Sequence, residues 1–258
     1  MKSLFSPLFP LPSRSFLASL SCLANRSLNQ LLPAPCLLCG SKHSHDLALI
    51  CAYCFEALPN LTIHPYRCNC CALPLTSNAN LCGQCLAHPP AFTRTLIPFL
   101  YQHPLDGLIH QFKYRRQLAS GQLLGELLIQ RIQQETLLPD LLVPAPIHWR
   151  KRWQRGFNQT EVLVHQLSKH LHIPFSYACL QPTPTHSQKG LTRTERLKNS
   201  RRRFVINPKT ITSIQHAHIA LLDDVVTTTA TARALSELLI AAGAKQVDIW
   251  ALARTPEH

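Results

Sequence analysis

The sequence IALLDDVVTTTATA, residues 219–232, decides the fold that we expect for this chain. Its first four residues are apolar, and so short an apolar run before polar residues favours a buried strand over a helix. From Ala230 onward the pattern ATARALSELLIAAGA favours a helix that ends at Gly243. We therefore expect Asp223 and Asp224 at the carboxyl end of a strand, just before a turn and a helix N-terminus.

The turn between this strand and this helix has the chemistry of a phosphosugar site. Backbone N–H groups and the helix dipole attract a phosphate at a helix N-terminus, and threonine hydroxyls add further donors. Two adjacent carboxylates can hold ribose hydroxyls or a Mg²⁺ ion. The alternative is a strand end whose aspartates only cap the next helix. The hydroxyl-rich turn favours a phosphate site formed by Thr227, Thr228, Thr229, Ala230 and Thr231.

The same segment resembles the signature for 5-phosphoribosyl-1-pyrophosphate (PRPP) in type I phosphoribosyltransferases. That signature has apolar residues, Asp-Asp, two further residues and then Thr-Thr/Ser-Gly. Residues 223–228 match it, and Thr229 stands where the family usually has glycine. A β-branched residue resists the positive φ and the close phosphate approach that glycine permits. The resemblance implies PRPP with Mg²⁺ as the ligand, and Asp223 and Asp224 as catalytic residues.

An excess of positive charge also indicates an anionic ligand. The chain has 26 Lys and Arg against 13 Asp and Glu, a formal net charge of +13. Between His148 and Arg203, twelve Lys and Arg stand against two Glu. This basic segment fits pyrophosphate, a phosphosugar or nucleic acid, and a solvated basic face is the alternative. The cations that we expect to contact the anion are Lys113, Arg155, Lys189 and Arg193.

Eight of the eleven cysteines form four Cys-x-x-Cys pairs. Each pair aims two thiolates at one point about 2.3 Å from each sulfur, so two pairs complete a tetrahedral Zn²⁺ site. Pairing in chain order gives two sites, whereas interleaved pairing and the replacement of Cys71 by Cys70 stay open. The expected zinc ligands are Cys36, Cys39, Cys51 and Cys54 in one site and Cys68, Cys71, Cys82 and Cys85 in the other.

Structural zinc explains these pairs better than disulfides or redox chemistry. A disulfide framework needs an oxidising compartment, and a redox Cys-x-x-Cys normally occurs once, near a βαβ unit. A cysteine-rich segment with few large apolar side chains gains on the order of 10 kcal/mol of folding free energy from each structural zinc. The resulting ribbon would either bind nucleic acid or a partner, or form a stapled lid on a larger domain.

Strands alternate with helices after residue 92, which predicts a parallel α/β sheet flanked by helices. The ligand site of such a sheet lies at the carboxyl ends of its strands. A basic loop that contains Arg155 and leads into a helix gives a second anion-binding turn. The further elements that we expect are strands over 92–101, 140–147 and 247–254, helices over 104–114 and 117–134, and a mobile loop with a short helix over 181–203.

The N-terminus is expected to be neither a signal peptide nor a membrane span. The chain has no run of eighteen apolar residues, and prolines and Arg14 interrupt the apolar stretch near the start. Together with the cysteine pattern, this favours the cytoplasm. We expect a helical segment over 1–32, with an amphipathic helix over 15–32, a double zinc ribbon over 33–89, and a phosphoribosyltransferase-like domain over 90–258.

Four further motifs follow the cysteine pairs in a characteristic order: PLDGLIHQFKY (104–114), VPAPIHWRKRWQRGFNQ (143–159), SQKGLTRTERLKN (187–199) and LLDDVVTTTAT (221–231). With these motifs, residues 36–254 resemble the ComF family, whose members include ComFC and GntX-like proteins. The resemblance implies a double zinc ribbon joined to a phosphoribosyltransferase-like domain. It also implies a role in natural transformation or in the use of external DNA as a nutrient. The implied ligands are PRPP and single-stranded DNA, and the DNA-uptake machinery is an implied partner.

The sequence leaves two functions open. In the first, the chain is a phosphoribosyltransferase that binds PRPP and Mg²⁺ over the twin aspartates and displaces pyrophosphate from ribose C1. In the second, it is a non-catalytic adaptor that kept the fold and binds single-stranded DNA, with Trp149, Trp153 and Phe157 stacking on bases. Thr229 in the usual glycine position would then mark a relaxed catalytic demand. The two functions are compatible, since PRPP could regulate the handling of DNA.

Overall fold

The computed structural model describes residues 34–42, 47, 49–147, 149–177, 179–182 and 204–256, and for 149–151 and 181–182 it describes the backbone alone. The chain divides into two units, Met1–Phe55 and Glu56–His258. The first unit contains the first four paired cysteines, and the second contains the other four together with the sheet. The domain boundaries after residues 32 and 89 stay predictions.

A tight turn carries the first cysteine pair of the first unit. The Cys36 N–H donates to the Ser41 carbonyl (2.9 Å), and the Cys36 carbonyl accepts from the Gly40 N–H (2.8 Å). Gly40 has a φ of 75°, a conformation that glycine adopts without steric cost. Helix α2 (Ala52–Glu56) follows and buries Cys54.

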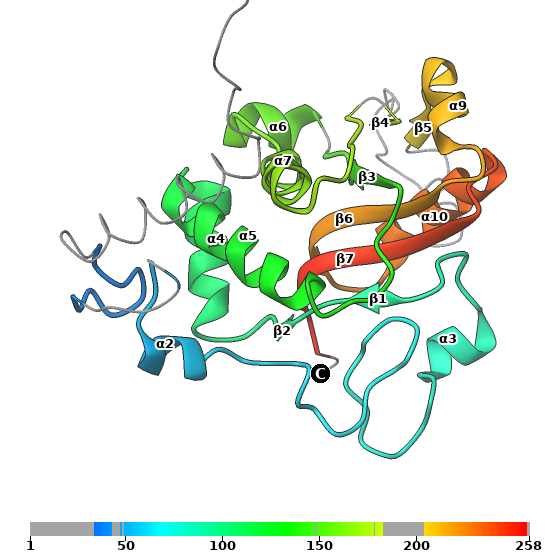
Figure 1. Ribbon diagram of the computed structural model, residues 1–258. Coiled ribbons are helices and arrows are strands. Elements are labelled where there is room, and N and C mark those ends of the chain that lie inside the picture. Colours follow the sequence, from blue (N-terminus) through cyan, green and yellow to red (C-terminus); the bar gives the residue numbers. More distant parts are fainter. Residues whose placement is uncertain are drawn as a thin grey trace, which may run out of the picture. The chain divides into compact units, whose positions relative to one another are not determined.

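The second unit is built on a five-stranded parallel sheet with β6 and β7 at its centre (Figure 1). The spatial order is β1-β7-β6-β3, and β2 also pairs with β7. Because all these pairs are parallel, the carboxyl ends of the strands lie at one edge of the sheet. The strands are β1 (Thr95–Leu96), β2 (Phe99–Leu100), β3 (Leu141–Pro144), β6 (His218–Val226) and β7 (Gln246–Arg254).

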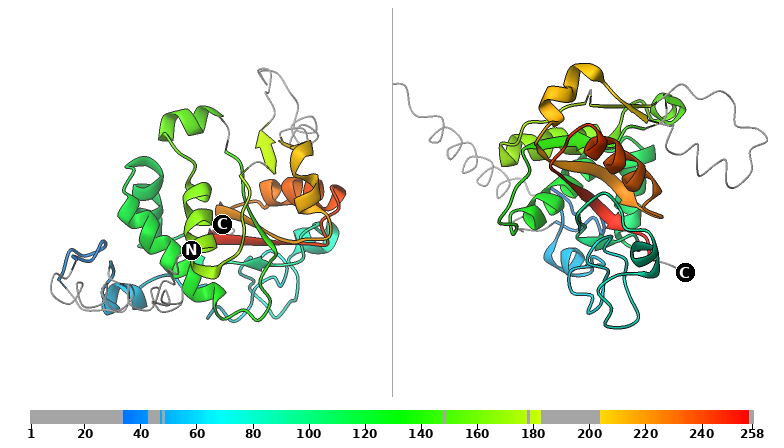
Figure 2. Two further views of the ribbon diagram at one scale, coloured as in Figure 1. Left: turned by 45° about the horizontal axis from the view of Figure 1, so that its top comes forward. Right: turned by 90° about the vertical axis from the view of Figure 1, so that its right-hand side faces the viewer.

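Helices cover both faces of the sheet, which is why β7 is buried from Val247 to Arg254. Helices α4 (Leu105–Tyr114), α5 (Leu118–Ile132) and α7 (Gln159–Leu171) pack together on one face, and α10 (Ala230–Ala241) covers the other (Figures 1 and 2). In the part of the chain that the structure describes, no helix combines the length and the apolar composition needed to cross a bilayer.

Shorter elements complete the described chain. Helix α3 follows the last cysteine pair, and α6 precedes α7. Strands β4 and β5 form a separate antiparallel pair. These elements are α3 (Gly83–Ala87), α6 (Trp149–Arg155), β4 (Leu180–Pro182), β5 (Phe204–Ile206), the 3₁₀ turn η2 (Pro208–Thr210) and α9 (Ile211–Ile214).

The predicted parallel sheet with flanking helices is confirmed, with three local differences. The basic loop expected to contain Arg155 is instead helix α6, and the turn into α7 begins only after Arg155. The strand expected over 92–101 is two short strands, because Pro98 between them cannot donate a ladder hydrogen bond. The strand expected over 140–147 is shorter and ends at Pro144, since Pro146 lacks the same donor. The helix expected over 15–32 and most of the loop expected over 181–203 lie outside the described residues.

A charge cluster lies at the opposite, amino edge of the sheet. The Asp248 carboxylate is 1% exposed, and its Oδ2 lies 2.9 Å from Arg94 Nε and 3.0 Å from His218 Nε2. Glu135 lies 2.7 Å from both Arg94 Nη1 and Arg131 Nη1. Burial alone would raise the pKa of Glu135, but Arg131 and Arg94 together lower it. The cluster therefore holds β1, β7 and the end of α5 together by charge.

Replacing Arg94 by Gln should lower the free energy of unfolding by about 1–2 kcal/mol at neutral pH, the partial exposure of Arg94 limiting the loss. The depressed pKa of Glu135 stabilises the fold above the unfolded carboxyl pKa, and this contribution is lost as the pH falls through the folded value. The free energies of unfolding of the wild type and R94Q, measured in urea, should therefore begin to converge as the pH falls below about 4, the unfolded carboxyl pKa. A stability difference that stays constant into acid would contradict the role of this cluster.

Candidate phosphosugar site and metal centres

The two aspartates lie at the carboxyl end of β6, beside helix α4. Asp223 pairs in register with Ala251 of β7, and its Oδ1 accepts a hydrogen bond from the Asp224 N–H (2.8 Å). The Asp224 Oδ2 lies 2.8 Å from Lys113 Nζ, and these two side chains are 16% and 14% exposed. Lys113, which we expected to contact an anionic ligand, thus forms an ion pair that joins α4 to the edge of the sheet.

The turn after β6 exposes two threonines and buries the third. Thr227 and Thr228 are exposed, whereas Thr229 is 3% exposed and has left-handed backbone angles, φ 59° and ψ 0°. An L-residue in this conformation costs roughly 1–2 kcal/mol. Thr229 therefore adopts the backbone conformation for which the related signature has glycine. The next two residues, both exposed, begin α10.

The turn between α6 and α7 is anchored at the same edge of the sheet. Asn158 caps α7 by accepting from the Thr160 N–H (3.3 Å), and its Nδ2 donates to the Ala145 carbonyl (3.3 Å). The Thr160 hydroxyl donates to the same carbonyl (2.9 Å). Ala145 directly follows β3, and its N–H donates to the Leu222 carbonyl of β6 (2.7 Å). This turn therefore lies beside the strand that carries the aspartates.

Arg155 is held between helices α4 and α7. Its Nη1 donates to Gln159 Oε1 (2.9 Å) and its Nη2 to the Tyr114 hydroxyl (3.1 Å), with the guanidinium 4.9 Å from the centre of the Tyr114 ring. Arg116 Nε donates to the Arg155 carbonyl (3.1 Å). Gly156 has a φ of 83°, and a Cβ there would lie 3.0 Å from the Arg116 guanidinium, so this turn favours glycine. The Arg155 guanidinium has more N–H donors than these bonds use.

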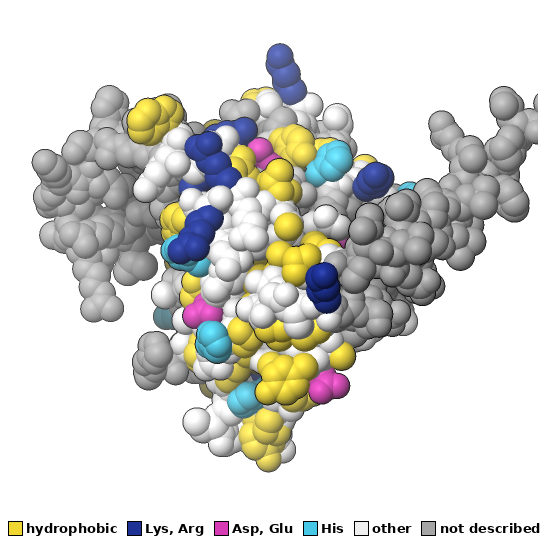
Figure 3. Space-filling model, turned by 90° about the vertical axis from the view of Figure 1, so that its left-hand side faces the viewer, with side chains coloured by type: hydrophobic (Ala, Val, Ile, Leu, Met, Phe, Trp, Pro, Cys, Tyr) yellow, Lys and Arg dark blue, Asp and Glu magenta, His cyan; other side chains and the backbone are white. Residues whose placement is uncertain are grey.

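The structure brings most of the predicted anion site to the carboxyl edge of the sheet. Lys189 and Arg193 lie outside the described residues. On the face drawn in Figure 3, most Lys and Arg side chains lie in the upper part, and single Asp, Glu and His side chains lie on the same face among hydrophobic and uncharged ones. The predicted residues that gather at the edge are Asp223, Asp224, Lys113, Thr227, Thr228, Thr229, Ala230 and Thr231, with the turn that carries Arg155.

The eight paired cysteines form two tetrads that follow chain order. Within each tetrad the four sulfurs lie within 4.8 Å of one another, with Cys39 and Cys51 3.8 Å apart and Cys71 and Cys82 3.6 Å apart. Four sulfurs at zinc-binding distance around one ion are about 3.8 Å apart, whereas a disulfide requires about 2 Å. The tetrads are Cys36, Cys39, Cys51, Cys54 and Cys68, Cys71, Cys82, Cys85.

The donor chemistry of the tetrads fits zinc. Backbone N–H groups donate to the Cys51, Cys68 and Cys82 sulfurs at 3.4–3.5 Å. Burial raises the pKa of Cys85 to about 12, while the Ser41 side chain and N–H lower that of Cys39 to about 6. A cysteine such as Cys85 would therefore ionise at neutral pH only beside a cation, and Zn²⁺, which binds cysteines as thiolates, would supply that cation at each tetrad.

Cys70 lies beside the second tetrad and is not part of it. Its sulfur is 3.9 Å from the Phe92 carbonyl. Burial, followed by the negative charge of Cys68, raises the pKa of Cys70 to about 11. Cys71, rather than Cys70, completes the sulfur cluster, and the interleaved pairing of the cysteine pairs does not occur.

Two arginines that the sequence analysis did not single out lie between the second tetrad and the turn after β6. Arg233, in the first turn of α10, donates to Cys85 Sγ (3.5 Å), and Arg254, at the end of β7, donates to the Cys71 carbonyl (3.2 Å). Arg233 is a cation near a helix N-terminus, where it opposes the helix dipole. Arg254 ends an apolar strand, and a buried arginine needs polar partners. Both features are visible in the sequence and could have identified these two arginines.

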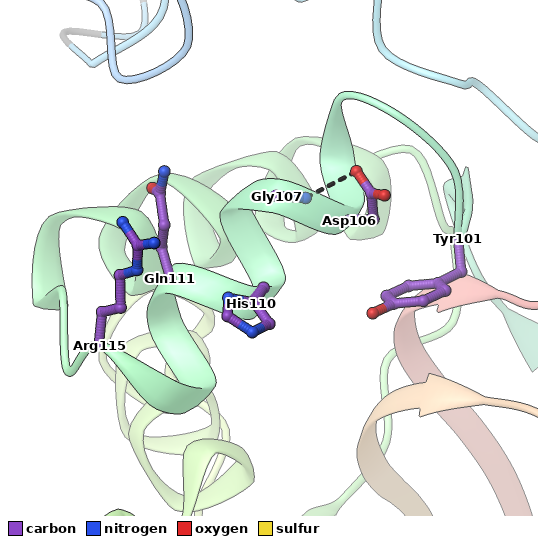
Figure 4. Close-up of a pocket in the computed structure, with 6 residues that line it drawn as sticks. All are labelled: Tyr101, Asp106, Gly107, His110, Gln111 and Arg115. Carbon is purple, nitrogen blue, oxygen red and sulfur yellow. Dashed lines mark hydrogen bonds between the residues drawn. The ribbon is translucent and has the colours of Figure 1, made fainter.

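A pocket of about 340 Å³ lies along α4 (Figure 4). The Tyr101 N–H at one end of the pocket donates to the Arg254 carbonyl (2.8 Å), so this wall begins at the carboxyl end of β7. Most of the residues that line the pocket are in α4, the helix that also contains Lys113. Its lining residues are Tyr101, Asp106, Gly107, His110, Gln111 and Arg115.

Comparison with known proteins gives matches for both parts of the chain. Residues 27–86 match the family described as double zinc ribbon domain. DNA utilization protein YhgH of Escherichia coli (strain K12) is 33% identical over 231 residues, which cover 87% of this chain and 98% of that protein. Competence protein F of Haemophilus influenzae (strain ATCC 51907 / DSM 11121 / KW20 / Rd) is 30% identical over 226 residues, 85% of this chain and 96% of that protein.

Solved structures give more distant matches. Adenine phosphoribosyltransferase from Leishmania tarentolae has a TM-score of 0.39 and 13% identity, covering 65% of this chain and 93% of its own. Glutamine PRPP amidotransferase from B. subtilis has a TM-score of 0.36 and 15% identity, covering 50% of this chain and 25% of its own.

Fold and cysteine geometry define the class first: a double zinc ribbon joined in one chain to a parallel α/β sheet. The identity to relatives that the chain matches over nearly their whole length then gives the family. The chain belongs to the ComF family, which contains DNA utilization protein YhgH and competence protein F.

The purified chain should contain two zinc ions, because each tetrad offers a complete tetrahedral ligand set. Cys71→Ser should remove one zinc, whereas Cys70→Ser, the matched control one residue away, should keep both. Elemental analysis of dialysed protein measures the zinc content. Loss of zinc from C70S, or its retention by C71S, would refute this ligand assignment.

Proposed function

We propose that this chain binds PRPP, or a related phosphosugar, together with Mg²⁺ at the carboxyl edge of its sheet, and that it serves the uptake or use of DNA in the cytoplasm. The observation that carries the proposal is the position of Asp223 and Asp224 in the last four residues of β6, just before the turn in which Thr229 is left-handed and from which α10 begins. The names of its relatives, DNA utilization protein and competence protein, support the biological role.

Each part of such a ligand has a matching group at this edge. The 5-phosphate would accept hydrogen bonds from the exposed Thr227 and Thr228 hydroxyls and from the N–H groups of Thr229, Ala230 and Thr231. The twin carboxylates would hold ribose hydroxyls and Mg²⁺, which prefers carboxylate and phosphate oxygens. The pyrophosphate would lie toward the turn that carries Arg155, and Lys189 and Arg193 are proposed as further contacts.

Lys113 forms an ion pair that sets the net charge of the site before the ligand binds. Its ion pair with Asp224 neutralises one of two adjacent carboxylates, which would otherwise repel an anionic ligand. A bound pyrophosphate offers Lys113 an alternative acceptor, and Mg²⁺ offers Asp224 an alternative cation. We therefore expect Lys113 to exchange Asp224 for the ligand when PRPP and Mg²⁺ bind.

The reaction proposed for this site is phosphoribosyl transfer. The bond from ribose C1 to pyrophosphate breaks, a bond from C1 to an acceptor forms, and negative charge develops on the departing pyrophosphate. Arg155 would stabilise that charge, because Tyr114 and Gln159 already hold its guanidinium in place. Bound Mg²⁺ supplies additional charge neutralisation.

Asp223→Asn/Asp224→Asn should weaken the binding of PRPP with Mg²⁺ at least about tenfold, since the ligands for Mg²⁺ lose their charge. Isothermal titration of the full chain measures the dissociation constant. The matched control is Asp106→Asn, which removes an exposed carboxylate from α4. Equal affinity of the wild type and the double variant would remove the assignment of this site.

A second candidate function is the non-catalytic binding of single-stranded DNA. The observation that favours it is Trp153 of α6, which is 87% exposed next to Arg152. The Arg152 side chain is 57% exposed, and its Nη1 lies 2.8 Å from Glu161 Oε1. Exposed aromatic rings among cations form stacking platforms for bases. Phe157, by contrast, packs against Phe112 with ring centres 5.6 Å apart, and the Trp149 side chain lies outside the described structure. Trp153 is therefore the residue proposed to stack.

Trp153→Ala should weaken the binding of a single-stranded oligonucleotide about tenfold, the loss of one stacked base, and leave PRPP affinity unchanged. Arg152→Gln should instead reduce the slope of log affinity against log salt by about one. Fluorescence anisotropy over a salt series measures both effects. A flat salt dependence of wild-type binding would rule out this function.

A further inference from the structure

Arg233 bonds at once to the second cysteine tetrad and to the turn after β6. Its Nη2 donates to Cys85 Sγ (3.5 Å), its Nη1 to the His88 carbonyl (2.5 Å) and its Nε to Thr229 Oγ1 (3.0 Å). A single guanidinium thus connects a zinc-ligand sulfur, the end of helix α3 and the turn at which a phosphate is proposed to bind.

We propose that zinc in the second tetrad fixes the conformation of the turn after β6 through Arg233, and thereby raises the affinity of that turn for its phosphate ligand. Arg233 is a positioning residue in this inference. Only the effect on ligand affinity rests on the proposed function. The zinc-dependent ordering of the turn is a property of the protein without ligand.

Thr229 is the reason why this turn needs such support. Its left-handed backbone, with φ 59°, is one that a β-branched residue adopts at a cost and glycine adopts freely. Conformations of this kind persist when the surrounding structure holds them in place. The buried Thr229 hydroxyl accepts the Arg233 Nε bond, so Arg233 is the group that holds this residue.

Arg254 holds the beginning of the same turn. This residue is 3% exposed. Its Nε donates to the Cys71 carbonyl (3.2 Å), and its Nη1 donates to the carbonyls of Val226 (3.1 Å) and Thr227. Both ends of the turn are therefore attached by arginines to residues of the second zinc site, Arg254 at Val226 and Thr227 and Arg233 at Thr229.

Zinc binding would change the hydrogen-bond acceptors of the second tetrad to which Arg233 and Arg254 donate. A zinc-bound cysteine sulfur is a thiolate, and its hydrogen bond with a guanidinium is charge-assisted and stronger than a neutral one. The ion also fixes the positions of the sulfurs, and with them the neighbouring Cys71 and His88 carbonyls. Donors that contact metal ligands in this way typically change metal affinity by about 10–100-fold.

Coupling between two sites acts in both directions. If zinc raises the affinity of the turn for the ligand, then the ligand must raise the affinity of the second tetrad for zinc by the same factor. The first tetrad lies in the other unit, and its Cys39 sulfur has its own partner, the Ser41 hydroxyl (3.0 Å), so its zinc is removed by substitution when the second tetrad is measured.

Hydrogen exchange of the ligand-free, zinc-loaded chain tests the first part. Arg233→Gln should reduce the protection of the peptide that covers 227–233 about tenfold, and Thr229→Val, which removes only the hydroxyl acceptor, should act in the same direction with two zinc ions retained. Arg131→Gln, which breaks an ion pair on α5, is the matched control. Wild-type protection of this turn in both R233Q and T229V overturns the inference.

Zinc release to a coloured chelator tests the link to the metal. In a Cys36→Ser/Cys39→Ser background, the remaining zinc belongs to the second tetrad. Arg233→Gln should weaken its binding about tenfold in this background, and Arg131→Gln should not change it. Equal zinc affinity with and without Arg233 would show that the guanidinium does not stabilise the bound zinc.

Adding PRPP with Mg²⁺ tests the link to the ligand. In the Cys36→Ser/Cys39→Ser chain, PRPP should tighten the binding of the remaining zinc several-fold when Arg233 is present and leave it unchanged in the Arg233→Gln variant, as measured by equilibrium competition with the chelator. PRPP that binds without altering the zinc affinity overturns the coupling. If PRPP does not bind at all, the proposed function fails, while the two ligand-free measurements still decide the ordering of the turn.

Discussion

The parallel pairing of β6 with both of its neighbours is the constraint on which the rest of the structure depends. Leu222 of β6 lies opposite Pro144 of β3 on one side and Trp250 of β7 on the other. Because helices cover both faces of the sheet, a shift of one residue would exchange the side chains buried on each face, so the register is strongly determined. This register brings the twin aspartates, the turn after β6 and the cap of α7 to one edge.

The second zinc ribbon continues the packing of the sheet. Its cysteines share one buried cluster with Phe92, Leu235 of α10 and Ile249 of β7. A segment with few large apolar side chains gains too little free energy from burial to fix its conformation, and zinc coordination would supply the remaining folding free energy. The shape of this ribbon matters beyond its own stability, because its sulfur and carbonyl groups are the acceptors for Arg233 and Arg254.

The charged groups at the two edges of the sheet differ in how deeply they are buried. At the amino edge, Asp248 is nearly inaccessible and contacts both Arg94 and His218, so that cluster serves stability. At the carboxyl edge, Asp224 and Lys113 form a pair that is still partly exposed, and the neighbouring threonine hydroxyls face solvent. Asp224 and Lys113 can replace their mutual ion pair by contacts with a ligand at a low cost in free energy, because both side chains are partly exposed. A fully buried charge network cannot do so, since breaking it leaves an unpaired charge in the interior.

The sequence by itself determined the features whose physics is complete within a few residues. The Cys-x-x-Cys spacing predicted two four-cysteine sites, whereas only the structure showed that the pairs combine in chain order and that Cys71, not Cys70, completes the second site. The apolar run, the aspartates and the hydroxyl-rich turn of residues 219–232 predicted a strand, its end and a helix N-terminus. The resemblance to the PRPP signature places a glycine at position 229, where a β-branched residue resists a positive φ, and the structure shows that Thr229 adopts a positive φ nevertheless. Tertiary structure alone decided which groups meet: Lys113 with Asp224, Arg233 with Cys85 and Thr229, and Arg254 with Cys71. Most of these partners lie far apart in the chain and meet only because the strand register and the zinc ribbon bring them together, so no local pattern carries that information.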